Sequence, residues 1–143
     1  MPQFNLHDVL NQALTTLYRS LPMFIGEVRP YTHSGDEKAT QLLANIVGDQ
    51  KHYSEKIAEL ILDLNGAPSP GQYPMIYTDL HLLSLDYLMT EVAEQQHRDV
   101  VTLAECAADA KNDQRARKLL EEVLGNARGH LESLEELVGQ AAR

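Results

Sequence analysis

Acidic and histidine side chains occur at helical spacing within stretches whose other residues form apolar helix faces. Asp49 and His52 are three residues apart, so both side chains reach the same side of a helix. Glu94 falls within an apolar stripe further along the chain, and His130 falls within another. Carboxylates and imidazoles that converge between helices suit iron, manganese or zinc. Asp49, His52, Glu94 and His130 therefore predict a site for one such ion, and a bundle that holds no metal is the alternative.

Four long helices are needed to position these residues. Apolar residues recur every three or four positions over four stretches, which predicts helices at about 6–29, 35–64, 79–110 and 114–138. Pro22 should kink the first helix because it removes a backbone hydrogen bond. The pattern predicts an all-α protein.

A long connection rich in helix breakers separates the second predicted helix from the third. It begins Ala-Pro-Ser-Pro-Gly-Gln-Tyr-Pro over residues 67–74 and shows no strand alternation. About 13 extended residues span about 40 Å, the length of such a bundle. Two antiparallel helical hairpins joined by one long crossover form a ferritin-like four-helix bundle. We expect residues 1–143 to form this bundle as a single domain.

The hairpin geometry predicts the heights of the candidate ligands. Reflection of the second hairpin about residue 112 sets Glu94 opposite His130. Reflection of the first hairpin about residue 34 sets residues 49–52 opposite residues 16–19. We therefore expect the four ligands to share one layer near the middle of the bundle.

This layout resembles the bacterioferritin and rubrerythrin branch of the ferritin-like superfamily. Asp49-Gln-Lys-His52 is similar to the first Glu-x-x-His motif of that family. Glu94 is similar to its third-helix glutamate, and His130 to its fourth-helix histidine. The resemblance implies a metal site between the helices.

The chain departs from the family pattern at two of the four carboxylates. Thr16, Leu17 and Tyr18 stand where the first helix of the family has a glutamate. Ala127 stands three residues before His130, where the family again has a glutamate. Two adjacent cations need these anions for charge balance. The departures disfavour di-iron chemistry and leave a reduced, single-metal site.

The orientation of Glu94 is open because its helix carries two apolar stripes. Glu94 lies in the stripe that contains Tyr87 and Val101. If the other stripe faces the core, Glu94 and His97 point to solvent.

The apolar excess of this helix also motivates a second function, a non-enzymatic bundle that dimerises or docks a protein partner. The residues behind that hypothesis are Leu82, Leu85, Leu88, Met89 and Val92.

Composition narrows the classes of function. A net charge of −9 with scattered basic residues disfavours nucleic-acid binding. The sequence has no run of about 18 apolar residues, the length needed for a membrane span, and no recognisable signal peptide. We therefore expect a cytoplasmic protein. We also expect a homodimer, because of the apolar excess on the third predicted helix. Cys106 is the only cysteine and should be a small buried thiol.

Catalytic motifs give no independent support for an enzyme. The sequence has no nucleophile beside a base, no Gly-rich phosphate loop and no cofactor fingerprint. A phosphotransfer bundle would use His97 or His130 as the phosphate acceptor. His130 lies on the helix seam rather than in solvent, which disfavours that function. Enzyme activity is therefore left undecided.

Overall fold

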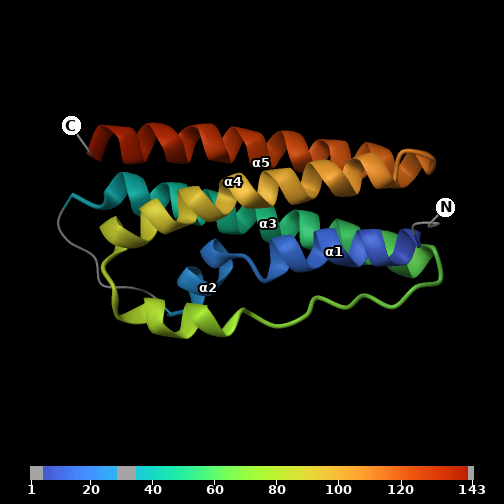
Figure 1. Ribbon diagram of the computed structural model, residues 1–143, viewed down its shortest axis with the longest axis horizontal. Helices are drawn as coiled ribbons and strands as arrows, with labels where there is room; N and C mark the ends of the chain where they lie inside the picture. The colour runs from blue at the N-terminus through green and yellow to red at the C-terminus, as the bar shows by residue number, and fades with distance from the viewer. Residues whose placement is uncertain (1–4, 29–34, 142–143) are drawn as a thin grey trace.

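The computed structural model describes residues 5–28 and 35–141 of an all-α protein (Figure 1). Its helical elements, in chain order, are α1 (Leu6–Tyr18), α2 (Leu21–Val28), α3 (Glu37–Asp63), the 3-10 helix η1 (Met75–Leu82), α4 (Leu85–Asp109) and α5 (Gln114–Ala141).

The long helices pack as a bundle of two antiparallel pairs. α1 packs against α3, and α4 packs against α5. The connection that follows α3 runs back along the bundle, so α3 and α4 point the same way (Figure 1). The pairs meet where α1 packs on α4 and where α3 packs on α5. α1 and α5 therefore lie on opposite sides of the bundle.

The first predicted helix is divided into two around Pro22. α1 ends at Tyr18, and α2 begins at Leu21. Pro22 thus lies in the first turn of α2, where its missing N–H is not needed. The Ser20 carbonyl accepts from the Phe24 N–H at 3.1 Å, which starts the new helix. The predicted kink is therefore a helix break, and the predicted end of the first helix at about residue 29 lies outside the described residues.

The other helices follow the predicted pattern with one change. α3 and α5 match their expected ranges, and Asn65 closes α3 with a left-handed φ of 63°. The third helix was expected from residue 79, but α4 begins at Leu85. The chain before it is the 3-10 helix, whose Tyr77 is buried with its ring centroid 5.7 Å from that of Phe24. This packing holds η1 separate from α4.

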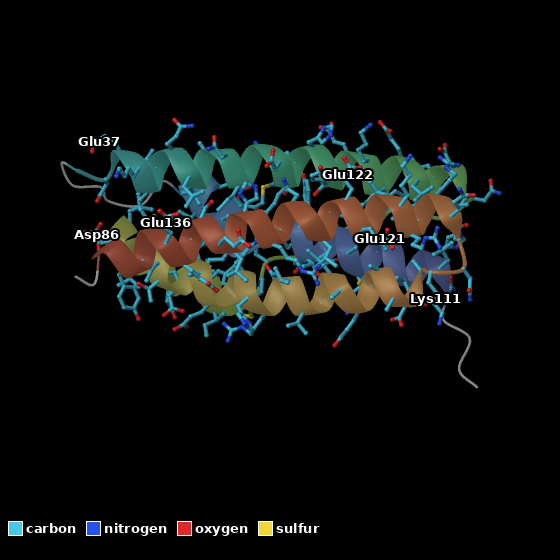
Figure 2. All side chains as sticks on the ribbon, turned by 90° about the horizontal axis from the view of Figure 1, so that it is seen from above. Glu37, Asp86, Lys111, Glu121, Glu122 and Glu136 are labelled. Carbon is cyan, nitrogen blue, oxygen red and sulfur yellow. The ribbon has the colours of Figure 1, made fainter. Side chains whose placement is uncertain are left out.

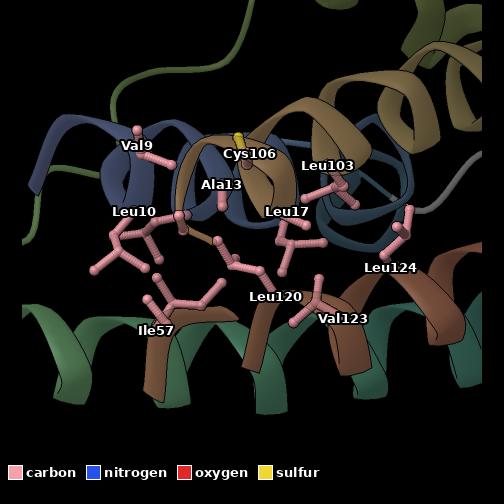
Figure 3. Packing of buried hydrophobic residues seen from close by; sticks show 14 of the residues in the cluster. Val9, Leu10, Ala13, Leu17, Ile57, Leu103, Cys106, Leu120, Val123 and Leu124 are labelled. Carbon is pink, nitrogen blue, oxygen red and sulfur yellow. The ribbon is translucent and has the colours of Figure 1, made fainter. Parts of the chain in front are cut away.

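Two apolar clusters fill the interior. The first joins α1, α3, α4 and α5, and Figure 3 shows Leu10, Ile57 and Leu120 converging within it. Its Cys106 is buried, and burial raises the pKa of the thiol to about 11, which confirms the predicted buried thiol. The second cluster lies around α2, η1 and the first half of α4.

Of the two apolar stripes of α4, the one that does not contain Glu94 faces the core. Leu85, Leu88, Met89 and Val92 are all buried in the second cluster. Because this stripe fills the core, it does not form the docking surface that its apolar excess suggested. These four buried residues are therefore not available to a partner, and dimerisation or docking through another surface stays a prediction.

The glutamates on the outer side of α5 project into solvent. Glu121 and Glu122 point away from α5 on its exposed side (Figure 2). Among the described residues, no helix combines the length and hydropathy needed to cross a membrane.

Candidate functional site

Asp49 of α3 and His130 of α5 meet at the edge where these two helices pack. His130 Nε2 lies 2.7 Å from Asp49 Oδ2, and Asn126 Nδ2 donates to the same oxygen at 2.9 Å. Asn126 precedes His130 by one helical turn, so both side chains reach one point on α3. The His130 side chain is 13% exposed and that of Asp49 is 45% exposed. The pair therefore lies at the rim of the bundle, open to solvent on one side.

The surroundings of Asp49 favour its ionised form. The hydrogen bond from Asn126 is the largest cause that holds the pKa of Asp49 below its usual 3.8. Partial burial opposes this effect, while contact with His130 and the charge of His52 add to it. Asp49 is therefore an anion at neutral pH, in the state that binds a cation.

His52 is exposed one helical turn beyond Asp49. Its ring lies edge-on to the ring of Tyr53, with 5.1 Å between the centroids. Across the described part of the chain, no three His, Cys, Asp or Glu side chains are grouped closely enough to hold a metal ion. The structure thus brings Asp49 and His130 together, with His52 nearby but turned toward Tyr53.

Glu94 lies on the outer face of α4. It is exposed, as are Tyr87 and Val101 of the same stripe, whereas the neighbouring residues Val92 and Gln96 are buried. No hydrogen bond or ion pair found among the described residues joins Glu94 to Asp49 or His130. The solvent-facing orientation, left open by the sequence, is the one observed.

Neutral polar groups occupy the interior between the two apolar clusters. Ser20 Oγ donates to Gln50 Oε1 at 2.6 Å, and Gln96 Nε2 donates to a backbone carbonyl of α5 at 3.0 Å. Ser54 Oγ and Gln96 Oε1 have no partner within the described residues. These buried amides and hydroxyls carry no charge to balance two metal ions, so the interior does not fit a di-metal site.

An open cavity of about 360 Å³, lined mostly by polar residues, lies on the other side of the bundle, between α1, η1 and α4. Asp99 is its only acidic residue, and Gln95 Nε2 donates to Asp99 Oδ1 at 3.0 Å. Burial raises the pKa of Asp99 to about 6. The lining residues are Gln12, Thr15, Thr16, Arg19, Ser20, Gln72, Pro74, Tyr77, Gln95 and Asp99.

Sequence analysis missed this cavity, although one signal was present. The core stripe of α4 is apolar up to Val92 and again from Leu103, but Gln95, Gln96 and Asp99 interrupt it. Polar residues within a core stripe indicate that this part of the helix faces polar groups or a cavity rather than apolar side chains.

No protein-family model matches the sequence, and a search of the curated proteins finds no match. The function must therefore be inferred from the side chains themselves.

Proposed function

We propose that this protein is a ferritin-like helical bundle that binds one divalent metal ion at the α3–α5 edge, through Asp49, His130 and His52. The 2.7 Å contact between His130 and Asp49 carries the proposal. A tetrahedral zinc ion with bonds of about 2.0–2.2 Å would set the two ligand atoms about 3.3 Å apart. An ion could therefore replace the shared proton after a movement of about half an ångström.

His52 would supply the third ligand. It lies three residues from Asp49 on α3, and its charge already affects the pKa of that carboxyl group. A change of its side-chain rotamer would move the ring from Tyr53 toward Asp49. Two imidazoles and one carboxylate form a set that suits iron(II), manganese or zinc and leaves positions for water. Glu94 is left out of this set because it lies on the outer face of α4.

The bundle layout supports the ferritin-like assignment. Two antiparallel helix pairs joined by a crossover along the bundle are the arrangement of that superfamily. The neutral interior layer departs from it. We therefore propose metal binding at the rim without a two-metal reaction inside.

Metal content per chain tests the proposal. Protein expressed with added iron, manganese and zinc, then dialysed, should retain about one ion per chain by elemental analysis. Asp49→Asn, His52→Ala and His130→Ala should each lose most of it, because each removes a ligand. Circular dichroism would establish that each variant remains helical.

Two exposed residues of α4 provide the controls. Glu94→Gln and His97→Ala should keep the metal content of the unmodified protein. Loss of metal in Glu94→Gln would show that the site includes α4, contrary to the set proposed. Unmodified protein without bound metal would refute metal binding altogether.

A further inference from the structure

The walls of the cavity between α1, η1 and α4 are held in place by hydrogen bonds to the crossover. Asn11 Oδ1 accepts from the Ser69 N–H at 2.7 Å, and Arg19 Nε donates to the Gly71 carbonyl at 2.8 Å. Gly71 has a φ of 71°, and a Cβ there would lie 3.3 Å from Thr15 Cγ2. The crossover thus lies close against α1, in a backbone conformation that favours glycine. The position of the crossover, and with it the shape of the cavity, is therefore fixed by specific contacts with α1.

The single basic residue of the cavity is engaged elsewhere. Arg19 donates to the crossover, and its guanidinium carbon lies 4.7 Å from the ring centroid of Tyr18 and 4.9 Å from that of Tyr73. These contacts hold the guanidinium against two aromatic faces. The ion pairs found among the described residues do not include Asp99. Asp99 therefore lines the cavity without an ion pair at contact distance, although the charge of Arg98 acts on it.

A partly buried carboxylate without an ion pair raises the free energy of the folded protein. Asp99 accepts a hydrogen bond from the neutral amide of Gln95. Arg98 on α4 is the charged group that acts on Asp99, by lowering its pKa against the effect of burial. Arg19 lines the same cavity, and Tyr77 of η1 interacts with Asp99 as a titratable hydroxyl. Burial and then the charge of Asp99 raise the pKa of Tyr77 to about 12, so its hydroxyl stays protonated. A bound cation would offset the cost of burying Asp99.

We propose that this cavity binds a small organic molecule that carries a protonated primary amine, with the ammonium group paired to Asp99. The volume of about 360 Å³ lies in the range of small-molecule sites and far exceeds that of a bare ion. An ammonium group has three N–H donors, and Gln12 and Gln72, whose amides can accept hydrogen bonds, also line the cavity. The hydroxyl of Tyr77 can contact a polar group on the rest of the molecule.

A matched pair of probes tests this inference. We would titrate the full chain with 4-amino-1-butanol and with 1,4-butanediol, and follow the amide signals of residues 95–99 by NMR. The two probes differ only in one ammonium group, so the amine should shift these signals and the diol should not. Equal shifts with both probes, or none with the amine, would overturn the proposal.

Variants separate Asp99 from the metal site. Asp99→Asn should abolish the response to the amine because the neutral amide cannot pair with ammonium. Asp49→Asn, on the other side of the bundle, should leave it unchanged whether or not that site binds metal. An amine response that survives in Asp99→Asn would refute the inference.

The pH dependence gives a third readout. With a pKa of about 6, about one in ten Asp99 carboxyl groups is ionised at pH 5, whereas the amine stays charged. The dissociation constant for 4-amino-1-butanol should therefore rise about tenfold from pH 8 to pH 5. A dissociation constant that is the same at both pH values would contradict pairing with Asp99.

Discussion

Two aspartates on the parallel helices α3 and α4 have opposite electrostatic environments. Asp49 accepts a hydrogen bond from Asn126 and contacts His130, and its pKa is lowered. Asp99 has one neutral donor, Gln95, and burial raises its pKa to about 6. The same residue type is thus stabilised as an anion in one place and destabilised in the other. The difference indicates that the donors around a carboxyl group, weighed against its burial, decide the direction in which its pKa shifts.

The two aspartates also face different partners. Asp49 points toward α5, whereas Asp99 lines the cavity beside α1 and the crossover. α5 and the crossover lie along opposite edges of the bundle (Figure 1). One helical framework therefore supports two chemically distinct regions that can be altered independently.

The largest expected effect is a gain of stability from Asp99→Asn. A pKa raised from 3.8 to about 6 means that the folded state binds the proton more tightly than the unfolded state. Ionised Asp99 therefore destabilises the fold, fully above pH 6 and not below about pH 4. The shift corresponds to at most about 3 kcal/mol. Asp99→Asn should raise the free energy of unfolding by about 2–3 kcal/mol at pH 8 and little at pH 4.

Urea denaturation at the two pH values would measure this gain. Glu105→Gln, an exposed change on the same helix, should alter the free energy of unfolding by less than about 0.5 kcal/mol. If Asp99→Asn were destabilising at pH 8, Asp99 would have a stabilising partner and the contrast with Asp49 would fail.

A smaller effect is expected in the neutral layer between the apolar clusters. Ser20→Ala removes the donor to Gln50 Oε1 and leaves that oxygen buried without its partner. The expected cost is about 2 kcal/mol, and Ser20→Ala/Gln50→Leu should recover part of it because Gln50 Oε1 is then no longer left unpaired. The Met23 N–H, which donates to Ser20 Oγ at 3.3 Å, loses that partner in both variants. Ser133→Ala, which removes an exposed hydroxyl on α5, is the control. Additive losses in the double variant would show that the two side chains do not stabilise each other.

The helices and their pairing were largely predictable from the sequence. Apolar periodicity placed α3 and α5 nearly at their observed bounds, because a repeated stripe on a long helix must be buried. The break around Pro22 was anticipated only as a kink. A proline fits either a kink or a new first turn, and tertiary packing selects between them.

The sites were less predictable than the fold. Asp49 and His130 were expected to converge, because hairpin geometry sets their heights. The orientation of Glu94 could not be decided, since α4 has two apolar stripes and only its packing against the other helices, chiefly α5 and α1, selects one. The cavity around Asp99 depends on where an irregular crossover lies, and such a segment has no periodicity from which to predict its path.

The smallest expected effect is the loss of stability from Asp49→Asn, whose sign at neutral pH is opposite to that of Asp99→Asn. A lowered pKa means that the folded state binds the proton less tightly than the unfolded state. Ionised Asp49 therefore stabilises the fold above about pH 4, and this contribution is lost as the pH falls through the folded-state pKa. Its side chain is 45% exposed, so solvent screening limits the effect to less than about 1 kcal/mol.

Metal-free protein is required for that measurement, so that a lost ion does not add to the effect. In urea denaturation Asp49→Asn should be less stable than the unmodified chain at pH 7, by a margin that shrinks at pH 3. Asp99→Asn, measured beside it, should be more stable at pH 7 and little changed at pH 3. If both substitutions changed stability in the same direction at pH 7, total charge would govern both aspartates, since either substitution removes one negative charge from a net charge of −9. Opposite signs would establish that the hydrogen-bond donors around each carboxyl group govern its effect on stability.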